Sequence, residues 1–319
     1  MDSYNIYIVV DAGSEIGMGH LSRCTAFYDR FSELGYNVKY LLDSDIDYSS
    51  FIGDRCCSCV NWHTDVRVLS EYVSHHDFIF LDSLHINQRQ AELISSICKK
   101  LIVIDDYLRL HYQNAIILDW TPNVENTDKH SVGKGNNKYM LGAGYAVLRK
   151  PFANYIYKHK IIKSDRLSIL VVMGGSDIRN LTYPIVKALE DKFPEYIIKY
   201  IDGKKNPADA NTMFLMMNDA DIVISAAGQT LFELLKLRKP TIPIQVIDNQ
   251  REDVDGMLHL GLYDEYYQWD DPQLMNKVLS KVNYLSDIKH REDAITHIKN
   301  IQFTSTPDEV IRLINECCY

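Results

Sequence analysis

The sequence predicts an α/β protein built from two doubly wound, Rossmann-like domains. Short runs rich in Ile, Val and Leu alternate with amphipathic stretches, which is typical of a parallel sheet covered on both faces. This pattern stops in a polar stretch and starts again near residue 166. The chain has 319 residues, about twice the length of a typical domain. We therefore expect an N-terminal domain over 1–155 and a C-terminal domain over 156–319.

In the first half, strands are predicted at 4–10, 37–43, 77–83, 100–106 and 114–120. The stretch 20–35 predicts a helix that ends at Gly35, since one helical face collects the apolar residues Leu21, Cys24, Phe27, Phe31 and Leu34. A second helix is predicted over 87–99. The stretch 138–152 predicts a strand followed by a tight crossing that contains glycine, and it leads into the second half.

In the second half, the stretch 166–177 predicts a strand followed by a glycine pair, and further strands are predicted at 196–201, 221–228 and 240–246. Helices are expected over 181–192, 208–218 and the stretch that contains "TLFELLKLR". A last helix near 307–317 could pack back on the N-terminal domain. The repeated strand–turn–helix order is the reason to expect a second doubly wound sheet.

Composition narrows the class of protein. The chain is 46% apolar and 24% charged, as in ordinary globular proteins, and its net charge of −9 argues against general nucleic-acid binding. No run of 18 apolar residues predicts a membrane span, and the first residues do not resemble a signal peptide. Seven scattered cysteines, an odd number, indicate a reduced protein, so a cytoplasmic location is expected.

One cysteine-rich stretch, "RCCSCVNWH", holds Cys56, Cys57, Cys59 and His63. Zinc sites usually combine Cys pairs from two separate places, and the sequence offers no second pair. We therefore interpret this stretch as a short buried strand with reduced thiols, and we expect no metal site.

Polar or glycine-rich segments follow most of the predicted strands. In doubly wound sheets, ligands bind outside the carboxyl ends of the strands, so these segments are expected to line a cleft between the two domains. They are 11–20, 82–85, 105–107, 142–145, 174–177, 225–230 and 245–250. Strand-end carboxylates such as Asp82 and Asp106 are common in any such sheet, so each one is weak support by itself.

His20 is the sharpest candidate in these segments, because it follows "GMG" where a helix begins. A neutral imidazole is well suited to activate water or a hydroxyl near pH 7, but a histidine at a helix start can also be a simple cap. Asp11, at the end of the first strand, could orient His20 or be structural. The segments "GMGH", "GGSDIRN" and "AAGQT" offer helix N-termini for anions, and none matches a P-loop or a G-x-G-x-x-G fingerprint.

Several of these segments together resemble one family. "IGMGHLSRC", "YAVLRKPF", "VVMGGSDIRNLT", "SAAGQTLFELLKLRKPTI" and the later "DNQ" are similar, in order over about residues 5–265, to blocks of the UDP-sugar hydrolases of pseudaminic acid biosynthesis. The wider relatives are GT-B glycosyltransferases. The resemblance implies a GT-B-like fold with UDP on the C-terminal domain and the sugar on the N-terminal domain. It also implies a reaction without metal or cofactor, in which a UDP-linked diacetamido-trideoxy hexose is cleaved at its anomeric carbon.

The resemblance also implies roles for individual residues. His20 matches the base that activates water, and Asp11 and Arg23 match polar positions of the same motif. Glu233 would accept hydrogen bonds from the ribose hydroxyls, the alternative being an exposed helix carboxylate. The positions expected to bind UDP or the sugar are Gly17, Gly19, Tyr145, Arg149, Gly174, Gly175, Asp177, Ser225, Gly228, Gln229, Thr230, Glu233, Asn249 and Gln250.

The chain departs from the family's "RxDxSxxIGxGH" at two positions, where Val9 replaces the Arg and Gly13 replaces the Ser. The sugar or the acceptor could therefore differ from the family's. A glycosyltransferase with the same UDP site and the same His remains an alternative, and so does a non-catalytic nucleotide-sugar binding protein. The small-molecule partner expected in each case is a nucleotide sugar.

Overall fold

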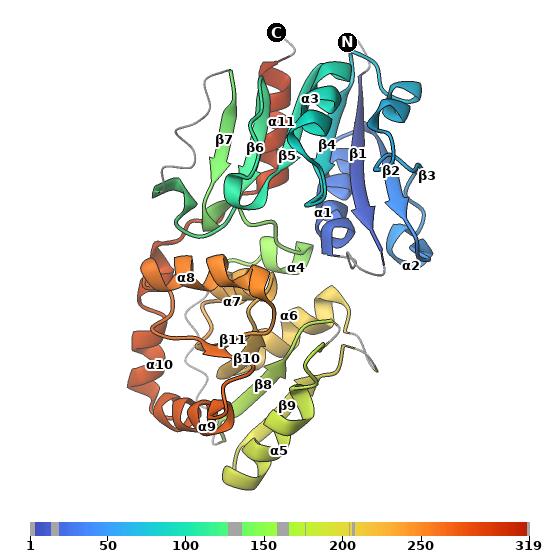
Figure 1. Ribbon diagram of the computed structural model, residues 1–319. Helices are drawn as coiled ribbons and strands as arrows, with labels where there is room; N and C mark the ends of the chain where they lie inside the picture. The colour runs from blue at the N-terminus through green and yellow to red at the C-terminus, as the bar shows by residue number, and fades with distance from the viewer. Residues whose placement is uncertain are drawn as a thin grey trace. The chain divides into compact units, whose positions relative to one another are not determined.

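The computed structural model describes residues 4–13, 19–126, 136–157, 166–175, 177–203, 205 and 208–317. The chain divides into two compact units (Figure 1), unit 1 with Met1–Val147 and Thr304–Tyr319, and unit 2 with Leu148–Phe303. Each unit contains one parallel sheet with helices on its faces, which confirms the predicted fold class. No helix of the described ranges is long and apolar enough to cross a membrane.

Unit 1 has a seven-stranded sheet in the order β3-β2-β1-β4-β5-β6-β7. From β1 the chain moves outward to β2 and β3 and then returns to the other side of β1 at β4. The switch point of this sheet therefore lies between β1 and β4, where ligands of such folds bind. The strands are β1 (Asn5–Ala12), β2 (Asn37–Ser44), β3 (Cys57–Cys59), β4 (Phe78–Asp82), β5 (Lys100–Ile104), β6 (Ala115–Asp119) and β7 (Lys138–Leu141).

Alternate residues of these buried strands face different helices, as the pleat of a strand requires. Phe80 packs on Phe27 of α1 (Gly19–Glu33), with ring centroids 4.3 Å apart. Ile79 and Leu81 belong to the core on the other face, together with residues of α3 (Gln88–Ile97) and of the 3₁₀ helix η1 (Val66–Glu71). Leu34 lies past the end of α1 and is exposed, so its predicted place on the buried face is wrong.

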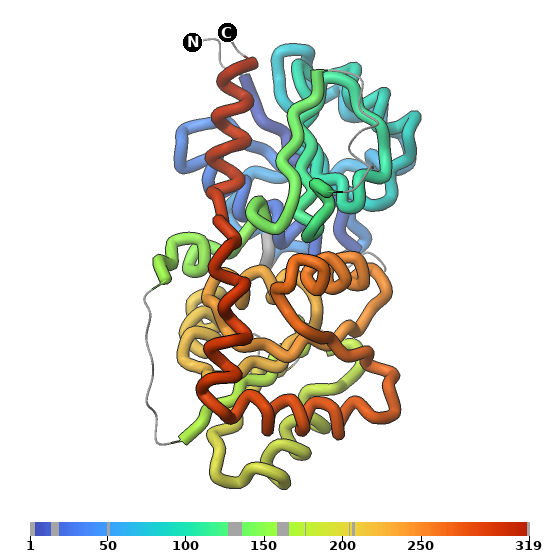
Figure 2. Tube along the Cα trace, turned by 90° about the vertical axis from the view of Figure 1, so that its left-hand side faces the viewer, coloured from blue at the N-terminus to red at the C-terminus, as the bar shows by residue number. Residues whose placement is uncertain are grey.

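The C-terminal helix α11 (Thr306–Glu316) packs on α1 within unit 1. The first and the last described residues lie close together in both views (Figures 1 and 2), and the Tyr4 hydroxyl is 3.2 Å from the side chain of Asn315. The amphipathic pattern of α11 explains this placement, since Val310 and Ile314 are fully buried.

The cysteine-rich stretch forms β3, a short strand as expected, but it is not buried. Cys56 and Cys59 are exposed and Cys57 is half-buried, so that part of the prediction is wrong. The reason is position, because β3 is an edge strand of only three residues that pairs with β2 alone.

The remaining helices are shorter or belong to unit 2. They are α2 (Ser49–Ile52), α4 (Lys150–Ala153), α5 (Thr182–Lys192), α6 (Ala210–Asp219), α7 (Thr230–Leu237), α8 (Arg251–His259), α9 (Leu274–Leu285) and α10 (Ile288–Ala294).

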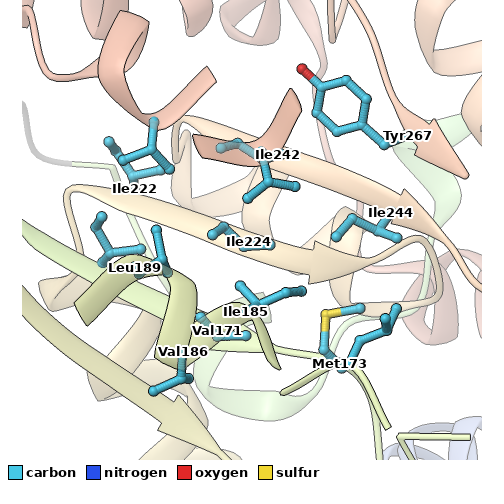
Figure 3. Close-up of a cluster of buried hydrophobic side chains, with 14 of the residues drawn as sticks. Val171, Met173, Ile185, Val186, Leu189, Ile222, Ile224, Ile242, Ile244 and Tyr267 are labelled. Carbon is cyan, nitrogen blue, oxygen red and sulfur yellow. The ribbon is translucent and has the colours of Figure 1, made fainter. Parts of the chain in front are cut away.

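Unit 2 has a five-stranded sheet in the order β12-β11-β10-β8-β9, with its own switch point between β8 and β10. Val171 packs with Ile224 and Ile185 in a core of branched side chains between the sheet and helices α5 and α9 (Figure 3). Helices α6 and α7 cover the other face. The strands are β8 (Ser168–Val172), β9 (Ile197–Ile201), β10 (Ile222–Ala226), β11 (Thr241–Gln245) and β12 (Tyr267–Gln268).

Candidate active site

The switch point of unit 1 holds a carboxylate and an imidazole in direct contact. Asp11 lies near the end of β1 and is fully buried, while His20 is the second residue of α1. Oδ1 of Asp11 is 2.6 Å from Nδ1 of His20, whose side chain is only 11% exposed. The first strand and the first helix therefore fix one edge of the His20 ring.

The second oxygen of Asp11 is shared by side chains from other loops. Ser83 donates its hydroxyl to Oδ2 at 2.5 Å, Nε2 of His63 lies at 2.9 Å and Nδ1 of His85 at 3.4 Å. Burial by itself would raise the pKa of Asp11, but the hydrogen bonds of His20, His63 and Ser83 outweigh it and hold this pKa far below its usual range. Asp11 is therefore ionised at neutral pH.

The charge on Asp11 decides the tautomer of His20. A carboxylate only accepts hydrogen bonds, so the neutral His20 ring carries its proton on Nδ1 and leaves the lone pair of Nε2 available. Burial would lower the pKa of His20, but the negative charge of Asp82 and the bond to Asp11 raise it above its ordinary value. His20 can thus act as a general base at pH values above this raised pKa.

Arg23, one helical turn after His20, is held by two carboxylates. It donates to both oxygens of Asp82 at 2.6 Å and to Asp106 at 3.0 Å, and its guanidinium lies 5.1 Å from the ring centroid of Trp120. Asp82 is fully buried, and burial alone would raise its pKa, but the charge of Arg23 outweighs burial and lowers this pKa. In this arrangement Arg23 fixes the carboxylate that acts on His20.

The switch point of unit 2 is built mostly from backbone. Gly174 has φ +81° after β8, a conformation that favours glycine, and a Cβ on Gly203 would lie 2.4 Å from the carbonyl oxygen of Gly175. Asp177 is turned inward, since its carboxylate accepts from the backbone N–H groups of Leu181 and Thr182 at the start of α5. Glycine at 203 thus lets two loop backbones touch.

The loop after β10 leads into the N-terminus of α7. Ser225 is fully buried at the end of β10, and Gly228, Gln229 and Thr230 follow it. Gln229 occupies the N-cap position, and the N-terminus of α7 presents backbone N–H groups and the positive end of the helix dipole, which suit an anion. The position of a Cβ on Gly228 would lie 3.5 Å from Nε2 of Gln250.

The segment after β11 completes this edge of the sheet. Oε1 of Gln250 accepts from the backbone N–H of Val246 at 2.9 Å, which fixes the amide group, whereas Asn249 is exposed. Since β8, β10 and β11 are neighbours, their following loops lie along one edge of the unit 2 sheet.

Glu233 is buried and not the exposed carboxylate of the alternative interpretation. Both its oxygens accept from Arg149 at 2.6 Å, and both residues belong to unit 2. Burial raises the pKa of Glu233, and the guanidinium of Arg149 offsets part of that rise. Tyr145 is half-buried in unit 1, where its carbonyl accepts from Thr306 at 2.7 Å.

Other predicted positions near the first motif have different surroundings. Gly17 lies outside the described residues, and Gly19 is the first residue of α1. Val9, in place of the family's Arg, is fully buried in the apolar core of unit 1. A Cβ on Gly13 would lie 2.4 Å from Oδ1 of Asp45, so a serine would require that side chain to move.

The sequence does not predict three residues of the Asp11 site, His63, Ser83 and His85. His63 belongs to the cysteine-rich stretch, where no signal connects it with Asp11. Ser83 and His85 belong to the segment 82–85, and their position after a strand is the one available signal. Among the residues the structure describes, no three His, Cys, Asp or Glu side chains are grouped so as to hold a metal ion.

Comparison with known proteins identifies relatives. No protein-family model matches the chain. The chain is 27% identical, over 81% of its length, to the Helicobacter pylori pseudaminic acid cytidylyltransferase and UDP-2,4-diacetamido-2,4,6-trideoxy-beta-L-altropyranose hydrolase, and it spans about half of that protein (47%). It is 22% identical to the Campylobacter jejuni UDP-2,4-diacetamido-2,4,6-trideoxy-beta-L-altropyranose hydrolase, over 80% of this chain and 97% of the relative. The predicted resemblance to this hydrolase family is confirmed.

Solved structures share the fold of this chain. A glycotransferase of kitacinnamycin matches 98% of the chain and 99% of its own, with a TM-score of 0.63 and 12% identity. The Methanocaldococcus jannaschii UDP-GlcNAc 2-epimerase matches 98% of this chain and 99% of its own, with a TM-score of 0.56 and 10% identity. The GT-B-like fold is thus shared by proteins whose names describe different reactions, so the fold alone does not assign one.

Proposed function

We propose that this protein hydrolyses a UDP-linked diacetamido-trideoxy hexose at the anomeric carbon and releases UDP and the free sugar. The observation that carries this proposal is the His20–Asp11 pair, with Nδ1 at 2.6 Å from a buried, ionised carboxylate and Nε2 left as the basic nitrogen. The names of the Helicobacter and Campylobacter relatives support the substrate class.

In the proposed step, Nε2 of His20 takes a proton from water while the water oxygen attacks the anomeric carbon. The bond from that carbon to the phosphate oxygen breaks, and its electron pair leaves with the β-phosphate of UDP. The configuration is inverted because a single displacement occurs. Asp11 keeps the ring oriented and stabilises the imidazolium that forms, and Arg23 positions Asp82, whose charge favours the same imidazolium.

We assign UDP to the switch point of unit 2. The N–H groups of the loop at Gly174 and Gly175 and of the helix start at Gly228, Gln229 and Thr230 would stabilise the developing phosphate charge. Ser225, Asp177, Asn249 and Gln250 would shape this site. Glu233 would bind the ribose hydroxyls while it keeps its bond to Arg149, and Gly17, Gly19 and Tyr145 remain proposed sugar contacts.

The freed sugar would serve nonulosonic acid biosynthesis for cell-surface glycans. This placement is supported by the printed name of the Helicobacter relative, which combines the hydrolase with a pseudaminic acid cytidylyltransferase. We further propose that the reaction takes place in the cytoplasm.

A panel of UDP-sugars, incubated with the protein in H₂¹⁸O and read by mass spectrometry, tests the reaction. We expect free sugar with one ¹⁸O atom and unlabelled UDP. Label in UDP would mean attack on phosphorus and would overturn an anomeric mechanism.

A glycosyltransferase is the second candidate. Val9 and Gly13 replace the family's Arg and Ser, and a glycotransferase is among the similar structures, so another hydroxyl in place of water is worth testing. UDP release from UDP-sugars without an acceptor supports hydrolysis. Release that begins only when a glycan or lipid acceptor is added would favour transfer.

A further inference from the structure

Oδ2 of Asp11 has a partner that the mechanism above does not use. The His63 ring presents Nε2 to this oxygen at 2.9 Å and stacks on the Trp62 indole, with centroids 3.9 Å apart. The His63 backbone N–H donates to Asp43 at 2.9 Å, and Trp62 is fully buried. Backbone and ring are both held, so His63 meets Asp11 in a fixed orientation.

We propose that His63 is a positioning residue for the reaction: its hydrogen bond to Oδ2 of Asp11 sets how strongly this carboxylate holds a proton on His20. The inference rests on the proposed role of His20 as the base. A carboxylate divides its charge between two oxygens, so a donor on Oδ2 draws charge away from Oδ1 and weakens the attraction for the proton of His20.

Among the described residues, the groups that face this pair come from several elements. Asp11 is contacted by His20 from α1, His63 from the loop after β3, and Ser83 and His85 from the loop after β4. His20 is also influenced by Asp82 and Arg23.

Among the imidazoles on Oδ2, His63 is the stronger partner. His85 lies at 3.4 Å and its side chain is 53% exposed, whereas His63 lies at 2.9 Å and is 24% exposed. His85 therefore serves as the matched control, since it offers the same type of ring to the same oxygen at a longer distance.

Two substitutions separate the roles of the His63 ring. His63→Phe keeps an aromatic ring to stack on Trp62 but removes the donor. His63→Gln keeps an N–H donor at a similar reach but removes the stacked ring. The His20 pKa is measured in the full chain, without substrate, by NMR titration of its ring nuclei in wild type, H63F, H63Q and H85F.

We expect H63F to raise the His20 pKa by about half a unit to one unit, as fits the loss of one hydrogen bond to a charged group, partly transmitted through Asp11. H63Q and H85F should each give less than half of the H63F shift. An unchanged His20 pKa in H63F, or an equal shift in H85F, overturns the proposal. Thermal melts identify any variant that does not fold, and H63Q and H63F change the fold contacts in different ways.

The pH profile of kcat/KM gives a second readout. In H63F the acid limb of this profile should move to higher pH by the same amount as the His20 pKa measured by NMR. At pH values below the His20 pKa, kcat/KM should therefore be about three- to tenfold lower than in wild type. The NMR shift does not depend on turnover. A shift without any UDP-sugar hydrolysis would overturn the proposed function alone, whereas hydrolysis with an unmoved limb and an unmoved His20 pKa would overturn the role of His63.

Discussion

Both units have their candidate groups at the switch point of the sheet, but unit 1 has side chains there and unit 2 has mostly backbone groups. Unit 1 uses side chains at its switch point, where Asp11 and Asp82 are fully buried and each is paired with a cationic or imidazole partner. Unit 2 uses backbone, with a glycine at φ +81° and a helix start. Proton transfer needs titratable groups in fixed orientations, whereas a phosphate needs N–H groups and room. The difference supports the proposal that unit 1 carries the chemistry and that unit 2 binds the nucleotide.

The largest expected effect is the loss of the base. His20→Ala should lower the rate of UDP-sugar hydrolysis by about 10²–10⁴-fold, because a positioned general base contributes that much. The affinity for UDP, measured by isothermal titration, should stay near that of wild type, because UDP is proposed to bind to unit 2 and His20 belongs to unit 1.

His76→Ala is a suitable control, since His76 is an exposed histidine of the same unit. A large loss of UDP affinity in H20A would assign His20 to the nucleotide site and break the contrast between the units.

The second effect concerns the stability of unit 1. Asp82→Asn removes the buried carboxylate that receives two bonds from Arg23, and we expect the free energy of unfolding to fall by about 3 kcal/mol, at the low end for a broken buried pair since Asp106 still binds Arg23. The His20 pKa should fall as well, because the charge of Asp82 raises it. Urea denaturation and the acid limb of kcat/KM measure the two effects.

Asp106→Asn is the matched control for D82N, because Asp106 binds the same guanidinium but is partly exposed. It should cost clearly less stability than D82N. Equal losses in both variants would mean that burial does not distinguish the two carboxylates.

The sequence predicted most of the elements that carry these groups. Runs such as 4–10 and 221–228 indicate buried parallel strands because both faces of such strands are apolar. The position of His20 after the first strand, together with the family resemblance, predicts a site at Asp11 and His20.

What the sequence could not supply is how loops from distant positions meet. His63 reaches Asp11 across 52 residues, and Glu233 reaches Arg149 across 84. Periodicity shows which face of an element is buried, but it carries no information on which loop side chains converge at one strand end. The sequence does not predict that Cys56 and Cys59 are exposed, for a related reason. An edge strand and an inner strand can have the same composition, so composition does not show which of the two a segment forms.

A third, smaller effect tests the backbone site of unit 2. Gly203→Ala would push a Cβ against the carbonyl oxygens of Gly174 and Gly175, at 2.6 and 2.4 Å, so this loop must shift. We expect UDP affinity to fall about tenfold, which corresponds to about 1.4 kcal/mol.

Gly175→Ala makes the test more specific, because a Cβ there meets no atom of the described residues within 4 Å. A loss of UDP affinity in G175A with unchanged stability would mean that the ligand itself approaches this backbone. Full UDP affinity in both variants would remove the glycine loop from the proposed site.

The smallest expected effect is a pH dependence of stability, caused by a third buried carboxylate of unit 1. Asp11 and Asp82 are paired with cationic or imidazole side chains, whereas this carboxylate has no such partner in the described part of the chain. Among the residues that the structure describes, Oδ2 of Asp119, at the end of β6, has no hydrogen-bond partner. Asp119 is fully buried, and burial raises its pKa from 3.8 to about 7. Between these two values the folded chain holds a proton that the unfolded chain has released. The free energy of unfolding must therefore fall as the pH rises through this range.

From pH 6 to 7.5 the loss should be about 1 kcal/mol. Asp119→Asn keeps an oxygen for the backbone N–H of Thr121 and does not titrate, so urea denaturation at the two pH values should show a flatter dependence than in wild type. Asp77→Asn is the control, because the pKa of Asp77 is lowered and its substitution should leave the slope between pH 6 and 7.5 unchanged. The same slope in D119N and wild type would mean that Asp119 is ionised throughout, and that the unpaired carboxylate of unit 1 behaves like the paired ones.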